Sequence, residues 1–189
     1  MTYTELIAKV SAWMNRTDLD AMIPDFIEIT EERLNRALRV RKMELVLAST
    51  PIVDNEIVLA SDVIDAKVLW VPDYESTPLK AQSLESVIAN GIYGLPTLYA
   101  WNGDVLRFDG AGSVQGVLYV RIPAIATAST NWVSEDAPSL YLFGALAEAK
   151  LYAGDDAGAQ LWMARFDQAL AEVIGNENRL SGPLVARAR

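Results

Sequence analysis

The sequence predicts an α+β protein: a bundle of about four helices with a β-rich insertion (hairpins or a small sheet) and an extended C-terminal arm. Apolar residues recur with helical spacing near both ends of the chain, whereas the middle alternates as strands do. The chain finishes on a basic stretch that a Gly-Pro pair interrupts. We therefore expect a helical core over 1–42 and 136–175, an insertion over 43–135 and an arm over 176–189.

The first two helices are predicted by their caps and their apolar faces. Thr2 and Glu5 have the spacing of a capping box. One helical face then collects Leu6, Ile7, Val10, Trp13 and Met14. Pro24 suits the first turn of a second helix. The apolar stripe of that helix contains Ile23, Phe26, Ile27, Thr30, Leu34, Ala37 and Leu38.

Strand signals begin near Met43. The stretches "MELVLAST" and "NEIVLA" read as strands around a tight turn at "VDNE", and "AKVLWV" and "GVLYVRI" are further candidates. "SLESVIANG" is typical of a short helix that Gly91 ends. "PTLYAWNGDVLRFDG" predicts a hairpin around Asn102-Gly103, in the type I′ geometry that Asn-Gly favours. Trp101 beside the tip would be an interface anchor if exposed, but packing against the sheet is the stronger expectation.

Two more helices are expected after the insertion. Pro138 opens a helix whose residues 140–153 carry only Glu148 and Lys150 as charges. Such a helix is too short to cross a bilayer, so protein should bury it on most sides. Asp155-Asp156 cap the next helix, and Gly175 fits its C-terminal stop. Its apolar face contains Leu161, Trp162, Phe166, Ala169, Leu170, Val173 and Ile174.

Composition excludes several kinds of chemistry. The chain has no cysteine and no histidine, which excludes disulfides, thiol nucleophiles, histidine-based catalysis and nearly all zinc sites. Its net charge of −9 opposes a tight grip on duplex DNA, because such affinity comes from cationic side chains. No apolar run approaches the ~20 residues of a membrane helix. We expect no catalytic residue, no cofactor, no metal site and no membrane contact.

Two kinds of charged cluster have competing interpretations. The arginines Arg33, Arg36, Arg39 and Arg41 form either a solvated helix face, with Glu32 and Arg36 paired, or a contact strip for an acidic neighbour. Paired acids occur at Asp18 and Asp20, Glu31 and Glu32, Asp62 and Asp65, and Asp155 and Asp156. A glycosidase needs two such carboxylates across a cleft. Helix capping, at Asp62 as well as Asp155-Asp156, and a turn at Asp18 explain most of them better.

The C-terminal stretch is the strongest candidate for binding a partner. Residues 178–189 hold three arginines and no acid. Their few apolar side chains cannot offset the entropy of ordering the backbone. The stretch is therefore either disordered or ordered by a partner that supplies backbone hydrogen bonds and acidic groups. The candidate binding residues are Arg179, Leu180, Pro183, Leu184, Val185, Arg187 and Arg189.

Three stretches carry a family resemblance: "SAWMNRTDLDAMIPDFIEITEERLNRALRVRKME", "YGLPTLYAWNGDVLRF" and "LYLFGALAEAKLYAGDDAGAQLWMARFDQALAEV". In this order, and over most of the chain, they resemble the head-to-tail adaptor (connector) proteins of tailed bacteriophages. The branch is that of short-tailed and related phages, which includes tubular tail proteins. The first stretch is the most specific, through residues such as Trp13, Asn15-Arg16, Ile23-Pro24, Asn35-Arg36 and Met43-Glu44. One departure is "LASDV" at 59–63, where a Leu-Pro-x-Asp type of segment is expected.

The resemblance implies a structural role without catalysis. Such adaptors form a twelve-fold ring beneath the portal once the genome is packaged. The implied partners are further copies of the chain, the portal protein, the next tail protein (a nozzle or tail tube component) and double-stranded DNA. The DNA would pass through the channel without specific binding, since an acidic lumen repels it. The implied location is the neck of the virion, and the host cytoplasm during assembly.

The resemblance also assigns roles to parts of this chain. The arm 176–189 would reach the portal, and the hairpin tip at Trp101, Asn102 and Gly103 would face the next tail protein. The strip of four arginines would contact a neighbouring copy or the portal. A ring would bury the helix 138–153 on two sides, by its own bundle and by the neighbouring copy.

Two other functions remain open at this point. One is a carboxylate-dependent glycan hydrolase carried in a phage tail, which needs a cleft that holds an acid of raised pKa and a partner carboxylate. The other is an adaptor or chaperone that binds one partner without ring symmetry. Counting the subunits distinguishes this last function from the ring.

Overall fold

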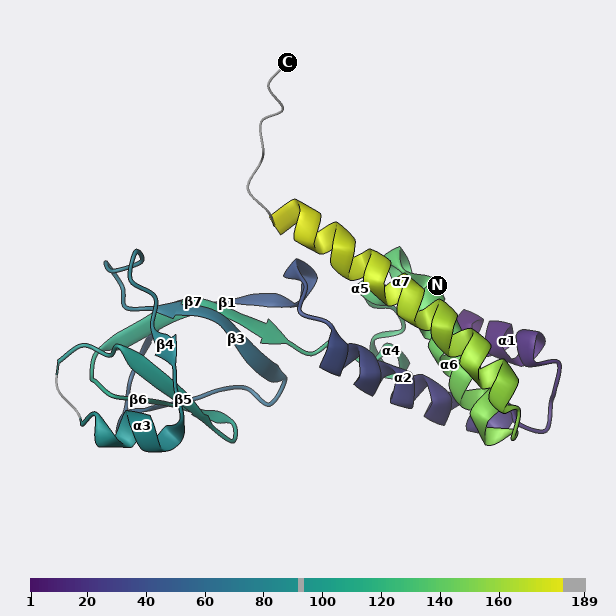
Figure 1. Ribbon diagram of the computed structural model, residues 1–189, viewed down its shortest axis with the longest axis horizontal. Coiled ribbons are helices and arrows are strands. Elements are labelled where there is room, and N and C mark those ends of the chain that lie inside the picture. The colour runs from purple at the N-terminus through teal and green to yellow at the C-terminus, as the bar shows by residue number, and fades with distance from the viewer. Residues whose placement is uncertain (92–93, 182–189) are drawn as a thin grey trace, which may run out of the picture. The chain divides into compact units, whose positions relative to one another are not determined.

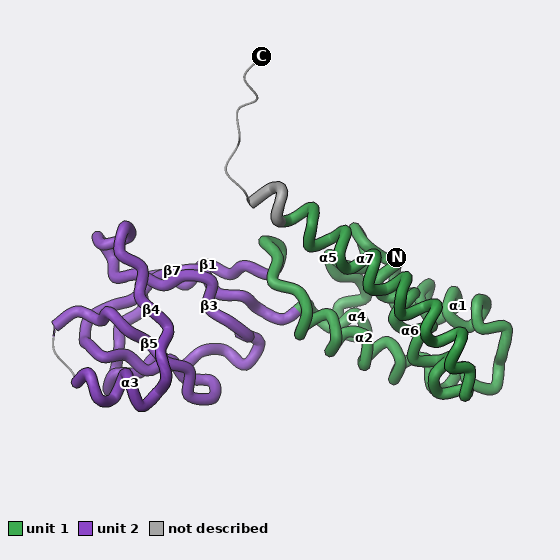
Figure 2. Tube along the Cα trace, in the orientation of Figure 1, with its two compact units in different colours: residues 1–42, 122–189 green, residues 43–121 purple. Residues whose placement is uncertain are grey.

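The computed structural model describes residues 1–91 and 94–181 and confirms the α+β class (Figure 1). The chain divides into two compact units (Figure 2). The helical unit comprises 1–42 and 122–189, and the β unit comprises 43–121. The insertion therefore ends earlier than the expected residue 135. The reason is that 122–135 include a short helix, α4 (Ile125–Ala128), and most of another, α5 (Trp132–Asp136), which packs on the bundle.

The helical unit is a bundle around one central helix. Within the described residues its long helices are α1 (Tyr3–Met14), α2 (Ile23–Ala37), α6 (Pro138–Tyr152) and α7 (Asp156–Ser181), and short 3-10 helices are η1 (Asp20–Met22) and η2 (Arg41–Met43). As expected, α6 is buried on most sides, because α1, α2, α5 and α7 of the same chain all contact it. Its own chain thus covers α6, which does not need a second copy for that purpose.

Local sequence signals set the helix ends of this unit. Thr2 and Glu5 form the predicted capping box at the start of α1. Pro24 lies in the first turn of α2. The Asp155 carboxylate accepts the backbone N–H of Gly158 at 2.9 Å and so caps α7, as predicted. These contacts satisfy N–H groups that the helices themselves cannot pair.

The predicted stop at Gly175 is wrong, because α7 continues through this residue to Ser181. A glycine inside a helix costs only about 1 kcal/mol relative to alanine, which the neighbouring turns can offset. Glu177 helps to hold the extra turns, since its carboxylate accepts hydrogen bonds from the backbone and side chain of Arg41. Residues 176–181, which were assigned to an extended arm, are therefore helical.

The β unit contains two sheets with mostly antiparallel strand pairs, and the two sheets share one core. Its elements are β1 (Glu44–Pro51), β2 (Glu56–Val58), β3 (Val63–Trp70), β4 (Lys80–Ala81), α3 (Leu84–Ala89), β5 (Leu98–Asn102), β6 (Val105–Phe108) and β7 (Ser113–Val120). One sheet has the order β1-β7-β3 and the other β2-β6-β5-β4. The core takes side chains from both sheets: Ile57, Leu59, Leu69, Leu79, Tyr99, Leu106, Phe108, Val114 and Leu118.

The two tight turns of the β unit differ in type. Asp54 and Asn55 both have positive φ, of 52° and 65°, between the bridged residues Val53 and Glu56, which is the pattern of a type I′ turn. In the β5–β6 hairpin Asn102 pairs with Val105, so the loop residues are Gly103 and Asp104. Of these only Gly103 has positive φ. The hairpin therefore matches type II′, and the predicted type I′ turn around Asn102-Gly103 is wrong.

No helix in the described residues is long and apolar enough to cross a membrane. Within the same residues, no group of three or more Asp, Glu, His or Cys side chains could hold a metal ion.

Candidate assembly surfaces

Arg33, the first of the four candidate arginines, is used inside its own chain. Its guanidinium donates to the Glu148 carboxylate of α6 at 2.7 Å and lies 5.7 Å from the ring centre of Phe166 on α7. A cation held between a carboxylate and an aromatic ring in this way braces α2 against α6 and α7. The sequence could not show this contact, because Arg33 and Glu148 are 115 residues apart.

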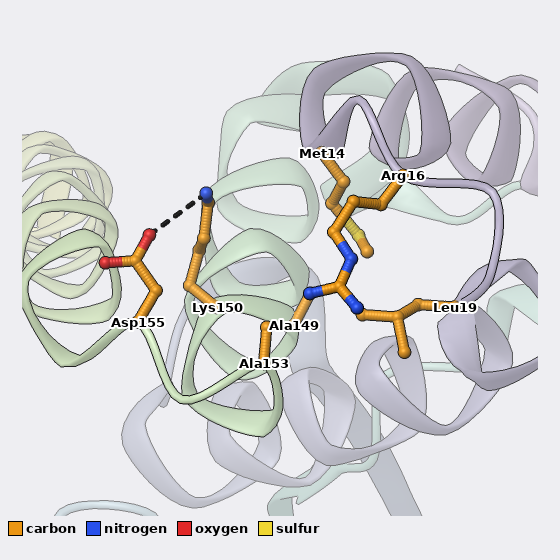
Figure 3. A pocket seen from close by; sticks show the side chains of 7 residues that line it. All are labelled: Met14, Arg16, Leu19, Ala149, Lys150, Ala153 and Asp155. Atoms are coloured by element: carbon orange, nitrogen blue, oxygen red, sulfur yellow. Dashed lines mark ion pairs between the residues drawn. The ribbon is translucent and has the colours of Figure 1, made fainter.

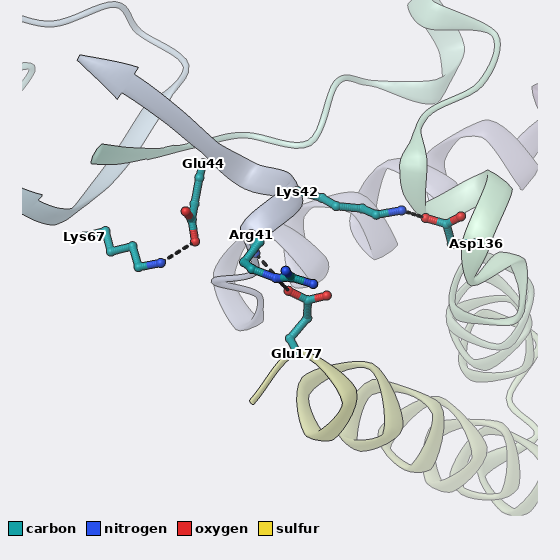
Figure 4. A network of polar contacts seen from close by, with 6 residues as sticks. All are labelled: Arg41, Lys42, Glu44, Lys67, Asp136 and Glu177. Atoms are coloured by element: carbon teal, nitrogen blue, oxygen red, sulfur yellow. Dashed lines mark hydrogen bonds and ion pairs between the residues drawn. The ribbon is translucent and has the colours of Figure 1, made fainter. Parts of the chain in front are cut away.

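Arg39 and Arg41 also make polar contacts with their own chain, whereas Arg36 makes none within the described residues. Arg39 donates to the backbone carbonyls of Asn35 and Leu38 at the end of α2. Arg41 pairs with Glu177 of α7 at 3.1 Å (Figure 4). Burial opposes ionisation of Glu177, but the hydrogen bonds from Arg41 outweigh it and lower the pKa of this carboxyl. Arg36 is exposed and makes no hydrogen bond or ion pair within the described residues.

Further ion pairs brace each unit near the point where the chain passes from one to the other. In the helical unit Lys42 pairs with Asp136 of α5 and lies 5.9 Å from the ring centre of Trp132 (Figure 4). Lys42 also lines a cavity of about 220 Å³ beside α7. In the β unit Lys67 donates to Glu44 at 2.6 Å. These cations serve the packing of their own units.

A partly exposed aromatic cluster lies where α1, α6 and α7 meet. The Trp162 ring is 5.6 Å from the ring of Trp13 and 5.6 Å from that of Phe143, measured between centroids. The Arg165 guanidinium lies over Trp162 at 4.9 Å. Trp13 is 51% exposed, although sequence periodicity assigned it to the buried face of α1, and Leu161 of α7 is 53% exposed. Clustered tryptophan and arginine side chains are typical of protein interfaces.

A groove between α6 and α7 continues this surface. Its volume is about 410 Å³, and its lining residues are Ser139, Phe143, Arg165, Gln168, Ala169 and Glu172. The floor is partly apolar, with a positive charge at Arg165 and a negative one at Glu172. Among the described residues, the Glu172 carboxylate accepts a single hydrogen bond, from Gln168 at 3.2 Å. The groove can thus receive a helix that carries both apolar and charged residues.

A smaller pocket, of about 130 Å³, lies between the end of α1 and the end of α6 (Figure 3). It contains Arg16 and Lys150, but each cation is already paired. Arg16 contacts Asp18 at 2.5 Å, and Lys150 contacts Asp155 at 3.1 Å. The Gly158 N–H and then Lys150 lower the pKa of Asp155. Because both cations are already paired with carboxylates, we interpret the pocket as a gap in the packing of the helix ends.

Several of the paired acids serve structural roles, although not always the predicted ones. Asp18 pairs with Arg16 in the turn after α1. Asp62 is not a helix cap, because it precedes β3, where its carbonyl accepts the N–H of Arg121. Glu31 accepts the Tyr141 hydroxyl at 2.7 Å. The carboxyls with a resolved pKa shift are all shifted down: Glu5, Asp18, Asp109, Asp155 and Glu177. A glycosidase acid needs the opposite shift.

The remaining candidate residues lie on the hairpin and at the C-terminus. Trp101 is partly buried against the β-unit core, whereas Asn102 and Gly103 are exposed. Arg179 and Leu180 fall on the last turn of α7, where only the backbone is described. Pro183, Leu184, Val185, Arg187 and Arg189 lie outside the described residues.

Comparison with known proteins gave one family. The model of the family described as SU10 adaptor protein matches residues 1–187. No curated protein matches the sequence.

Proposed function

Because the chain belongs to the SU10 adaptor protein family, a family of phage head-to-tail adaptors, we propose that its copies form a ring under the portal. The ring joins the capsid to the tail of a tailed bacteriophage and lets the genome pass. The observation that carries this proposal is the extent of the family match, which covers 187 of the 189 residues. Both compact units lie almost wholly inside the match, so the whole chain takes part in the role.

The ring is proposed to have twelve copies, with the helical units side by side. The exposed Trp13, the partly buried Trp162 and the adjoining groove supply an apolar and charged surface of the kind that subunit contacts use. Since α6 is already covered by its own chain, the neighbouring copy meets the outer helices instead. The contact between copies therefore uses α1, α2 and α7, together with the part of α6 that lines the groove.

The C-terminal arm is proposed to bind the portal. Arg179, Arg187 and Arg189 supply charges for acidic groups, while Leu184 and Val185 supply apolar contacts. Because α7 extends to Ser181, Arg179 lies on the last turn of a helix. Many arms acting together turn a weak single contact into a lasting one.

The β unit is proposed to face the next tail protein, with the exposed hairpin tip at Asn102 and Gly103 as a contact. The channel is proposed to conduct double-stranded DNA without binding it. A net charge of −9 on each copy repels the phosphate backbone, so the DNA slides without adhering. During assembly the protein resides in the host cytoplasm, and in the virion it occupies the neck.

Deletion of residues 182–189 tests the role of the arm. The truncated chain keeps all of α7, so its far-UV circular dichroism and melting temperature should match those of the full chain. We expect it to fail in a pull-down with the portal protein of its own phage. The matched variant Arg187→Lys with Arg189→Lys keeps the charge and should retain most of the binding. Full binding by the truncated chain would remove the arm from the portal contact.

A further inference from the structure

The outer side of α2 carries a stripe of exposed residues that are unpaired within the described part of the chain. Asp25, Ile29, Glu32 and Arg36 follow one another at offsets 0, 4, 7 and 11, so they share one side of the helix. Ile29 is 41% exposed. Glu32 and Arg36 are spaced for an ion pair, yet within the described residues they form none, and Asp25 has no partner there either. We call this set the α2 stripe.

The outer side of α7 carries a second stripe with the same spacing. Leu161, Arg165, Gln168 and Glu172 also stand at offsets 0, 4, 7 and 11. Three of them line the α6–α7 groove, and Leu161, one turn before Arg165, is exposed. We call this set the α7 stripe. Both stripes contain one aliphatic residue and charges of both signs, but their charges follow different orders along the helix.

The two stripes belong to different sides of the helical unit. Arg33 of α2 contacts Met163, which marks the side of α7 that faces its own α2. Met163 and Arg165 are two residues apart, which is about 200° around a helix. The α7 stripe therefore faces away from the α2 of the same chain. Two unlike faces on different sides suit a head-to-tail contact, which closes into a ring.

Helix direction fixes how the stripes would meet. In one chain Arg33 contacts Met163 and Arg41 contacts Glu177, so α2 and α7 advance in the same direction, as Figure 1 also shows. In a closed ring of many copies, each copy is turned by only a modest angle from the previous one. The α2 of one copy therefore stays nearly parallel to the α7 of the next.

Parallel alignment gives complementary charges. When residues of equal offset in the two stripes face each other, Arg36 lies opposite Glu172. Arg165 then lies opposite Ile29, within one turn of both Asp25 and Glu32. The antiparallel alignment would pair Glu32 with Arg165, but it would place Asp25 against Glu172 and Arg36 against Leu161, so its one attractive pair is offset by one repulsive pair. We propose that the α2 stripe of one copy lies in the α6–α7 groove of a second copy, parallel to the α7 stripe, with Arg36 paired to Glu172. This inference rests on the proposed ring and names its subunit contact.

Crosslinking between single-cysteine variants tests the contact, because the chain has no cysteine of its own. Arg36→Cys and Glu172→Cys would be assembled with the portal protein of the same phage, separately and as a mixture, and treated with a short bis-maleimide. We expect covalent dimers only in the mixture. The double variant should give a ladder of multimers. Dimers of Arg36→Cys alone, or no dimers in the mixture while rings are visible by negative-stain electron microscopy, would overturn the contact.

Charge reversal gives an independent measurement. Arg36→Glu and Glu172→Arg should each raise the concentration needed for assembly by roughly tenfold or more, since like charges then face each other. The combined variant should return to within about threefold of the original chain. Glu75→Arg, an exposed reversal in the β unit, should have little effect. Equal defects in the combined and single variants would contradict the pairing. A wild-type chain that forms no ring would instead refute the proposed function itself.

Discussion

The helical unit and the β unit differ in the sequence separation between the partners of their buried hydrogen bonds. In the helical unit Tyr141 is fully buried, donates to Glu31 and accepts from Asn131, which joins segments up to 110 residues apart. In the β unit the buried carboxylate of Asp109 accepts hydrogen bonds from Asn90, Thr97 and Leu98, all within 19 residues. The helical unit is thus assembled from both ends of the chain, whereas the insertion closes on itself.

The largest expected effect is a loss of stability that is confined to the β unit. A Cβ at Gly116 of β7 would lie 2.2 Å from the backbone carbonyl oxygen of Val68 on β3. Backbone cannot move aside as a side chain can, so Gly116→Ala should cost roughly 3 kcal/mol or more. Hydrogen exchange should show lost protection over 43–121 with α6 still protected. Equal loss in both units would contradict the view that the insertion closes on itself.

The second effect is a pH dependence in the β unit. Burial alone would raise the pKa of Asp109, but the hydrogen bonds from Leu98, Thr97 and Asn90 outweigh it and lower this pKa. A lowered folded-state pKa gives stability that is complete above the unfolded value of about 3.9 and is lost as the pH falls through the folded value.

Asp109→Asn should therefore destabilise the β unit by about 2 kcal/mol at neutral pH, because several donors lose a charged acceptor. Urea unfolding between pH 7 and pH 3 provides the measurement. The wild-type stability should decline below about pH 4 more steeply than that of the variant. Parallel declines in the two proteins would show that other carboxyls dominate the dependence of stability on pH.

A smaller cost is expected for the matched change in the helical unit. A Cβ at Gly144 of α6 would lie 2.4 Å from Cγ2 of Thr30 on α2, which is a side-chain atom. Thr30 is buried and β-branched, so it can move only slightly, and Gly144→Ala should cost about 2 kcal/mol. Adding Thr30→Ser removes that methyl group and should recover part of the loss, as measured by thermal unfolding. If the serine gives no recovery, the close approach of α2 and α6 is not the cause.

The smallest effect is a gain of stability. Gly175 lies inside α7, and a Cβ there would meet no atom within 4 Å. Gly175→Ala should stabilise the helix by about 0.5–1 kcal/mol, because alanine restricts the unfolded chain and favours the helix. A rise in the melting temperature checks this. A fall in the melting temperature would mean that residue 175 is not helical in the folded protein.

Local signals in the sequence predicted the helix starts well. Thr2 with Glu5, Pro24 and Asp155 each act through residues within one turn, so their roles are visible without the fold. The helix stop predicted at Gly175 is wrong because the Arg41–Glu177 contact, which supports the extra turns, joins distant segments of the chain. The hairpin turn was misread by one residue, since strand pairing decides which two residues form the loop.

The assembly surfaces were harder to predict for the same reason. Sequence periodicity placed Trp13 inside, but Trp162 of α7 meets it on the surface of the bundle. The arginine strip was identified by composition, yet Arg33 is occupied by Glu148 and Arg41 by Glu177. Only tertiary structure shows that Arg36 is exposed and has no such partner within the described residues.

Cryo-electron microscopy of the intact virion neck tests the central claim most directly. The account predicts a closed ring of copies of this chain between the portal and the tail, with the helical units in lateral contact and a channel wide enough for duplex DNA. Finding the protein there as isolated monomers, or only as a soluble factor absent from the virion, would contradict it.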